Sequence, residues 1–285
     1  MVARFWPAGM VTRPFSSRQH RPIGYCTVVG MQLGIALPFA DLSGGPLRPD
    51  SQVSAARTIE QLGYSSIWTF DAVGRGFMMS DPLMALAVAA SGTTNVGLGT
   101  GILQLPIRNV AEVVHRLFSL EVLAPGRVLF GVGPGSTRDD FEVFGGDYGG
   151  RFAEFDRQWG ELRQFVREGK ADRRDLCAWS QVLGKPALML AGWRGPWVER
   201  AAAEAAGWIT SGARADDDQL AEALTRYREA GGRRAIVTTI RVCADVGPTI
   251  DRLHRLADIG FDDAVVFDLD ASVDRLAAVR QGFAS

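Results

Sequence analysis

The sequence predicts an α/β protein of the (β/α)8 barrel class, the TIM barrel. From Met31 onward, short apolar runs alternate with longer segments of helical periodicity, which is typical of parallel strands joined by crossover helices. Eight such strand–helix units occupy about 250 residues, the usual size of this barrel, whereas a doubly wound open sheet usually has fewer strands. Four of the apolar runs end in small residues, which indicates one shared site at the carboxyl ends of the strands.

Each predicted element follows from a local pattern. The strands are short apolar runs, at residues 32–37, 66–70, 96–101, 127–133, 187–191, 208–210, 235–242 and 263–267. Capping residues at the starts and glycine or proline at the ends bound the helices between them. These helices comprise residues 50–62, 82–90, 110–123, 152–167, 196–206, 216–230, 248–259 and 273–283.

Residues 1–30 differ from the barrel domain, which we place at residues 31–285. They contain four arginines, three prolines and no acidic residue. We expect a disordered extension or a start codon assigned too far upstream, because Met31 directly precedes the first strand. A targeting peptide is the alternative, but the segment lacks the apolar region of a secretory signal.

Composition narrows the class of partner. With 31 Lys and Arg against 32 Asp and Glu, the net charge of −1 gives no field for nucleic acid or a membrane surface, so we expect a small-molecule substrate. The three cysteines and three histidines form neither a disulfide framework nor a metal motif. We therefore predict no metal and a reduced, cytoplasmic protein.

The run 131–136 follows a predicted strand and is rich in glycine. Gly131, Gly133 and Gly135 alternate, so one backbone edge carries no side chains and a ligand can approach it closely. A dinucleotide fingerprint is excluded, because Ser136 takes the place of its third glycine. In the alternative interpretation the glycines only end the strand tightly.

A second alternation, Gly97, Gly99 and Gly101, lies in the predicted strand 96–101. Inward positions of a barrel normally carry branched side chains, so glycines leave room for a flat ligand or for Phe or Met side chains from neighbouring strands. We expect Trp68 to pack in the core.

The best predicted anion site follows the strand 187–191. A glycine-containing loop there enters a helix near Pro196, which offers unpaired N–H groups and the cation of Arg194 to a phosphate. The usual barrel phosphate site follows the last two strands, but Asp268 and Asp270 would repel an anion there. The loop and the end of the neighbouring strand comprise Ala191, Gly192, Trp193, Arg194, Gly195, Thr210, Ser211 and Gly212.

Few carboxylates lie at the predicted rim. Asp71 follows the second strand, and Asp139, Asp140 and Glu142 follow the fourth. A rim carboxylate more often caps a helix than transfers a proton, and Asp139 and Asp140 have the positions of first-turn helix residues.

Three segments together resemble the luciferase-like flavin and deazaflavin oxidoreductases, a barrel family that includes bacterial luciferase. They are VGLGTGIL at 96–103 with Pro106 and Arg108, LAPGRVLFGVG at 123–133, and AGWI at 206–209. The resemblance extends from Met31 to about Phe267. It implies a non-prolyl cis peptide at Gly101-Ile102 behind the cofactor ring, and a cofactor tail at the loop 191–195 and the strand end 210–212. The cofactor-binding residues thus expected are Gly99, Thr100, Gly101, Ile102, Gly133, Pro134, Gly135 and Ser136, together with the eight residues of the anion site.

The resemblance also implies the reaction. We expect hydride transfer between the deazaflavin coenzyme F420 and a small organic substrate, with FMN as the alternative cofactor. Family members place Asp-His after the second strand, where this chain has Asp71-Ala72, and an acid where it has Ser136. Asp71 and Ser136 are therefore the candidate catalytic residues, and the proton-transfer groups stay open. The segment 175–185 is shorter than the insertion of many members, which implies an open pocket or one covered by the partner in a homodimer.

Two further functions remain open from the sequence. A flavin-binding barrel without catalysis agrees with the missing histidine and acid. A lyase or isomerase for a phosphorylated substrate would use Arg194 and the adjacent helix without a flavin.

Overall fold

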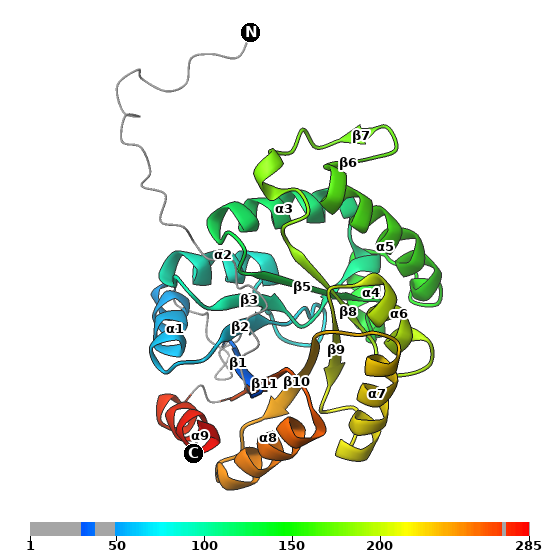
Figure 1. Ribbon diagram of the computed structural model, residues 1–285. Helices are drawn as coiled ribbons and strands as arrows, with labels where there is room; N and C mark the ends of the chain where they lie inside the picture. Colours follow the sequence, from blue (N-terminus) through cyan, green and yellow to red (C-terminus); the bar gives the residue numbers. More distant parts are fainter. Residues whose placement is uncertain (1–29, 38–48, 270–271, 285) are drawn as a thin grey trace, which may run out of the picture.

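The chain folds into a closed barrel of eight parallel strands surrounded by helices, which confirms the predicted fold class (Figure 1). The structure is a computed structural model and describes residues 30–37, 49–269 and 272–284; the expectations for residues 1–29 and for Asp270 lie outside these ranges. Strands follow the order β3-β2-β1-β11-β10-β9-β8-β5, and pairing of β3 with β5 closes the barrel. The barrel strands are β1 (Gln32–Ala36), β2 (Ser66–Thr69), β3 (Gly97–Thr100), β5 (Val128–Gly133), β8 (Ala187–Ala191), β9 (Gly207–Ser211), β10 (Ala235–Arg241) and β11 (Asp263–Phe267).

Helices form the outer layer, and each of the eight barrel strands is followed by at least one (Figure 1). Local signals fix their ends: Asp81 accepts the N–H groups of Leu83 and Met84 at the start of α2, and Asp216 forms a capping box with Gln219 at the start of α7. The helices are α1 (Pro49–Gln61), α2 (Pro82–Gly92), α3 (Val110–Leu123), α4 (Arg138–Phe144), α5 (Arg151–Glu168), α6 (Trp197–Glu204), α7 (Asp217–Glu229), α8 (Gly247–Ile259) and α9 (Val273–Ala284).

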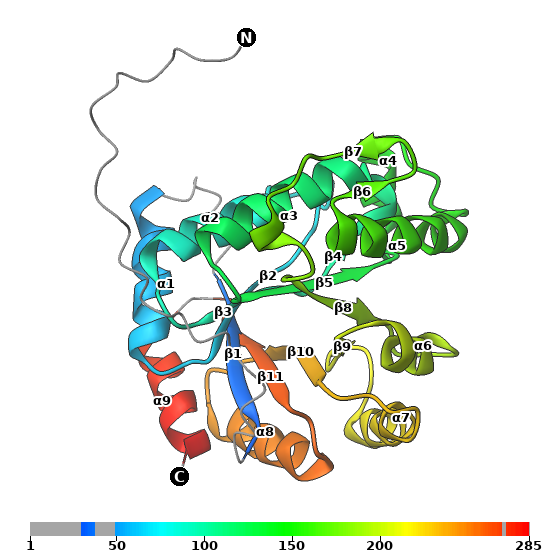
Figure 2. The same ribbon diagram turned by 45° about the horizontal axis from the view of Figure 1, so that its top comes forward.

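Several elements interrupt the simple alternation. The strand predicted at 96–101 stops at Thr100, and β4 (Leu103–Gln104) resumes the pairing with β5 after the bond Gly101-Ile102. That bond is cis, as the resemblance implied. Helix α4 lies between β5 and α5, with Asp139 and Asp140 in its first turn as expected. A hairpin of β6 (Lys170–Ala171) and β7 (Arg174–Asp175) lies at the outer edge of the helix layer beside α5 (Figure 2).

Two apolar cores hold the fold together. The larger one lies between the strands and the helices, where the burial of aliphatic side chains from both layers removes apolar surface from water. The smaller core fills the barrel and contains Trp68, Leu129, Met189, Ile209, Ile236 and Val265. Trp68 is fully buried, which confirms its predicted core position. Among the described residues, no helix combines the length and apolar character that crossing a membrane would require.

Candidate functional site

Small and apolar residues from three strand ends meet above the inner core. Ile102 and Ala191 are partly buried and pack against this core, and Gly133 lies between them. A methyl group added at Gly133 would lie 3.3 Å from Ile102 Cδ1 and 3.4 Å from Ala191 Cβ. These three residues form an apolar shelf at the carboxyl ends of β5 and β8, where barrel proteins bind their ligands.

The glycines below this shelf have a different role. The Trp68 ring lies against Gly99, since a methyl group there would lie 2.4 Å from Trp68 Cε3. This corrects the interpretation that the strand leaves room for a flat ligand at Gly99 or for Phe or Met. At Gly101, by contrast, Phe70 Cε1 would lie 3.2 Å from an added methyl group. Thr100 is also fully buried, and its hydroxyl donates to the Gly131 carbonyl at 2.8 Å.

Gly131 likewise serves barrel closure. A methyl group there would lie 2.2 Å from the Thr100 carbonyl oxygen and 2.4 Å from Ile209 Cδ1. A side chain at this position therefore clashes with the backbone of β3. The alternating glycines of β5 divide accordingly, with Gly131 packed inside the barrel and Gly133 on the shelf.

A pair of hydroxyl groups lies at the ends of β9 and β10. Ser211 Oγ and Thr239 Oγ1 are 2.6 Å apart, and both residues are half-buried. Thr239 has a φ of +59°, an outlier for a β-branched residue. It lies in a β-bulge, where the register of β10 with β11 shifts between Val237 and Ile240. Bulges re-aim side chains beside functional sites. No sequence signal marks Thr239, because its conformation depends on pairing with both neighbouring strands.

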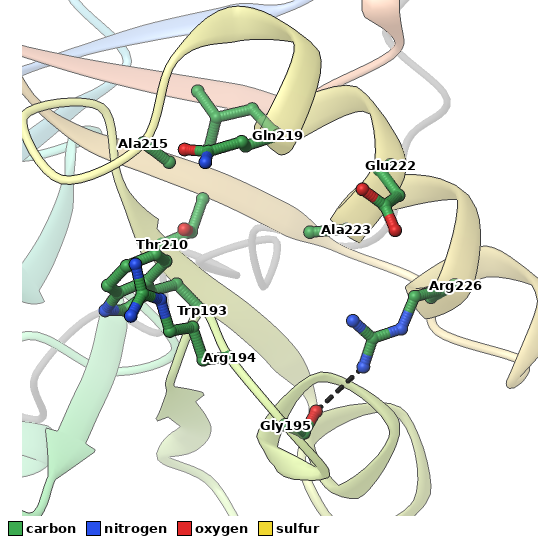
Figure 3. Close-up of a pocket in the computed structure, with 10 residues that line it drawn as sticks. Trp193, Arg194, Gly195, Thr210, Ala215, Gln219, Glu222, Ala223 and Arg226 are labelled. Atoms are coloured by element: carbon green, nitrogen blue, oxygen red, sulfur yellow. Dashed lines mark hydrogen bonds between the residues drawn. The ribbon is translucent and has the colours of Figure 1, made fainter.

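Four residues of the predicted anion site line one pocket of about 170 Å³: Trp193, Arg194, Gly195 and Thr210 (Figure 3). Residues of α7 form its other side. The Arg194 guanidinium lies 3.7 Å from the centroid of the Trp193 ring, and the described residues include no ion-pair partner for it. Thr210 is 3% exposed, and its hydroxyl oxygen has no hydrogen-bond partner within the described part of the chain. Gly192 and Gly212 lie beside this pocket rather than on its lining, next to the shelf and the hydroxyl pair.

An acidic side chain already occupies part of the anion site. The Glu199 carboxylate accepts its own backbone N–H in the first turn of α6, and it pairs with Arg226 at 2.7 Å. These bonds lower the pKa of Glu199, the backbone bond first and the Arg226 bond next. Arg226 also donates to the Gly195 carbonyl at 2.7 Å (Figure 3). Arg194 is thus the cation of the pocket without a neutralising partner in the described chain.

The expected repulsion at the end of β11 is weaker than its sequence indicated. Asp268 is almost fully buried as a side chain and pairs with Arg275 at 2.8 Å. Its negative charge is therefore compensated within the fold.

The loop after β5 carries the remaining predicted residues. Pro134 and Gly135 are half-buried, and Ser136 is exposed. Arg214 in the loop after β9 donates to Ser136 Oγ at 3.0 Å, and the Tyr148 hydroxyl donates to the Ser136 carbonyl at 3.1 Å. Arg214 and Tyr148 were not among the sequence candidates, since they reach this loop only through the tertiary fold.

Asp71 belongs to a buried polar network beside the shelf. Its carboxylate accepts from Arg108 at 2.7 Å and from the Gln104 N–H at 2.9 Å. The Gln104 side chain donates at 2.8 Å to Asp140, which also pairs with Arg75. The structure therefore engages both oxygens of Asp71, the candidate catalytic acid, in fixing the loop that begins at β4.

The two carboxylates of this network have opposite pKa shifts. Burial raises the pKa of Asp71, and the charge of Arg108 only partly opposes this effect. Burial also acts to raise the pKa of Asp140, but hydrogen bonds from Arg75 and from the Val73 N–H outweigh it and hold the pKa below its ordinary value. Asp140 is therefore firmly ionised at neutral pH.

Fold and geometry together define a barrel protein with a candidate ligand site at the carboxyl rim, composed of an apolar shelf, a hydroxyl pair and a cationic pocket. The family model for luciferase-like monooxygenases matches residues 31–267. The chain belongs to this family, which confirms the resemblance of its sequence.

Curated relatives match parts or most of the chain. Limonene 1,2-monooxygenase of Rhodococcus erythropolis is 34% identical over 90 residues, which are 31% of this chain and 23% of that protein. The chain thus matches about a quarter of that relative's length. An uncharacterised protein of Mycobacterium tuberculosis is 29% identical over 245 residues, covering 75% of this chain and 83% of that protein.

Solved structures share the fold at low identity. An F420-dependent secondary alcohol dehydrogenase, in complex with an F420-acetone adduct, has a TM-score of 0.71 at 15% identity, and the match covers 89% of this chain and 99% of that chain. The oxygenating constituent of 3,6-diketocamphane monooxygenase from Pseudomonas putida, in complex with FMN, has a TM-score of 0.64 at 17% identity and covers 81% and 73% of the two chains.

Proposed function

We propose that this chain is an oxidoreductase that transfers a hydride between the deazaflavin coenzyme F420 and a small organic substrate, with FMN as the alternative cofactor. The observation that carries the proposal is the meeting of Ile102, Gly133 and Ala191 in one apolar shelf beside the Ser211–Thr239 hydroxyl pair. Family membership supports the cofactor class, as do the similar structures in complex with an F420-acetone adduct and with FMN.

The residues present fit the ring of such a cofactor. The shelf is apolar and free of large side chains at Gly133, which suits the face of a flat ring system. Thr239 Oγ1 also donates to the Thr238 carbonyl at 2.6 Å, so Ser211 is the donor within the hydroxyl pair. Ser211 Oγ then keeps its lone pairs for a polar group of the cofactor.

The residues also fit an anionic tail. Thr210 and Arg194 line the same pocket, and the buried Thr210 hydroxyl has no hydrogen-bond partner in the described part of the chain. Arginine and hydroxyl donors are suited to phosphate oxygens.

When bound, the cofactor supplies the hydride chemistry, while the protein supplies position and exclusion of water. In this proposal the shelf supports the ring, Ser211 holds one polar edge and Arg194 with Thr210 holds the tail. Ser136, three residues beyond Gly133 of the shelf, has an exposed position at the rim. Asp71 is assigned a positioning role, because its ion pair with Arg108 fixes the loop after β4.

A non-catalytic cofactor-binding barrel is the second candidate. It is favoured by the engagement of both Asp71 carboxylate oxygens in structural hydrogen bonds, one from Arg108 and one from the Gln104 N–H. This candidate predicts cofactor binding without turnover.

A fluorescence titration of the full chain with F420, FMN and FAD tests the cofactor binding that both candidate functions require. We expect F420 to bind more tightly than FMN, and FAD more weakly than either. Tighter binding of FMN would reverse the cofactor order, and the absence of binding by all three would refute the proposal. Gly133→Val provides the site control, because its branched side chain occupies the shelf and should weaken binding at least about tenfold.

A further inference from the structure

Arg214 lies at the rim between the loops that follow β5 and β9. Its guanidinium donates to Ser136 Oγ at 3.0 Å across 78 residues of sequence. Ser136 is three residues beyond Gly133 of the shelf, and Arg214 is three residues beyond Ser211 of the hydroxyl pair. The contact therefore joins the two polar edges of the candidate site, on either side of β8.

Arg214 makes no ion pair among the described residues. Its guanidinium donates to a neutral hydroxyl, although such a group has five donors in a planar fork. Its side chain is exposed, so the remaining donors face solvent and not a buried partner. This arrangement leaves a forked cation available to a carboxylate or phosphate.

The surroundings of Ser136 carry further positive charge. Arg138 and Arg151 lie 4.9 Å and 3.9 Å from the centroid of the Tyr148 ring, whose hydroxyl donates to the Ser136 carbonyl. Neither arginine has an ion-pair partner in the described part of the chain.

The carboxylates of α4 and of the loop after it form no ion pair with these arginines in the described chain. Asp140 of α4 is paired with Arg75, and Asp147 accepts the Gly149 N–H. Asp139 and Glu142 lie on the exposed part of α4, and no ion pair joins them to Arg138, to Arg151 or to Arg214 in the described chain. Like charges held close together favour an anionic ligand, because its binding removes their mutual repulsion.

We propose that Arg214 recognises an anionic group of the substrate, a carboxylate or a phosphate, with the Ser136 hydroxyl as a second donor. The inference rests on the proposed function in one respect, that the shelf holds the cofactor and leaves the Ser136–Arg214 edge to the substrate. At the position where the family resemblance implied an acid, this chain has Ser136, whose neutral hydroxyl accepts a hydrogen bond from Arg214. The preferred charge of the ligand at this position is therefore negative.

A pair of probes of nearly equal shape tests the charge preference. Benzoate and neutral benzamide are titrated into the full chain, with and without bound cofactor, and binding is measured by isothermal calorimetry and by saturation-transfer NMR. The variants are Arg214→Ala, Ser136→Ala and Arg173→Ala, the last an exposed arginine of the β6–β7 hairpin that matches the change in net charge.

We expect benzoate to bind at least about tenfold more tightly than benzamide, because a charge-assisted hydrogen bond is worth about this factor. Arg214→Ala should remove this preference, whereas Arg173→Ala should leave it unchanged. Ser136→Ala should retain it within about threefold, since it removes the neutral acceptor and keeps the cation. If Arg214 only held the loops after β5 and β9 together, Ser136→Ala and Arg214→Ala would lower benzoate affinity and thermal stability to the same extent.

Three results would overturn the proposal. The first is that benzoate does not bind the unaltered chain. The second is that Arg214→Ala binds benzoate as tightly as the unaltered chain does. The third is that Arg214→Ala loses affinity for the cofactor and that benzoate competes with the cofactor for binding. The last result would assign Arg214 to the cofactor's own phosphate. Failure of F420 and FMN to bind would refute the proposed function alone, because the benzoate measurements on the cofactor-free chain still test the charge preference.

Discussion

Replacing Gly131 by alanine should destabilise the barrel without touching the ligand site. The new methyl group would lie 2.2 Å from the Thr100 carbonyl oxygen, against an ordinary contact of at least 3.4 Å. One of the two strands must therefore move by roughly 1.2 Å, and such overpacking costs about 1–3 kcal/mol. The lower entropy of the unfolded alanine chain returns about 0.4–1 kcal/mol. The net loss is about 1.3 kcal/mol at the centre of a range of roughly 0–2.6 kcal/mol, or about 3–5 °C in Tm at that central value.

The assay combines urea denaturation with cofactor titration. Gly133→Ala is the matched comparison, because its methyl group would lie 3.3 Å from a flexible side-chain atom of Ile102 and should be tolerated in the fold. We expect Gly133→Ala to weaken cofactor binding and to keep the stability of the unaltered chain. Gly160→Ala in α5, with no atom within 4 Å of the new methyl group, should stabilise by about 0.5–1 kcal/mol. The reasoning is refuted if Gly131→Ala is as stable as the unaltered chain and loses cofactor binding.

Three further predictions concern the polar groups of the rim. Because the fold lowers the pKa of Asp140, its ionised form stabilises the folded state at pH values above the unfolded pKa of about 3.9, and this stabilisation is lost as the pH falls through the folded pKa. Asp140→Asn should therefore flatten the acid side of a profile of unfolding free energy measured from pH 3 to 7. Asp71→Asn should cost about 3 kcal/mol in urea denaturation, since it leaves Arg108 largely buried with a weakened partner; an unchanged midpoint would contradict the positioning role. Thr239→Gly should fold at least as stably as the unaltered chain, because glycine adopts a φ of +59° freely. The same variant should bind the cofactor about threefold to tenfold more weakly, because the contact with Ser211 is lost. Equal cofactor affinity would remove the hydroxyl pair from the site.

Most of the fold could be predicted from local patterns. All eight predicted strands occur, and each bound differs by no more than one residue, because each strand is an apolar run flanked by turn residues. Hydrophobic periodicity did not indicate the separate strand β4 or the short helix α4. Two-residue and seven-residue elements are too short to produce a clear hydrophobic period.

The structure brings four residues of the expected anion site together. Trp193, Arg194, Gly195 and Thr210 line one pocket at the loop and the neighbouring strand end. The sequence did not indicate that Glu222 of α7 would line this pocket, nor the pairing of Glu199 in the first turn of α6. The Glu199 carboxylate lies at a helix start, where acidic residues are common, but its contact with Arg226 joins two helices and leaves no trace in the local sequence.

The sequence by itself determined the class of fold, the order of the strands and the rim at which the candidate site lies, because hydrophobic period and chain connectivity set these properties. Only the tertiary structure decided which glycine packs against β3 and which lies on the shelf. Gly131 and Gly133 have the same local pattern, but the first faces the Thr100 carbonyl and the second faces the shelf. The tertiary structure also brought Arg214 to Ser136, since contacts between residues 78 positions apart depend on how the barrel closes.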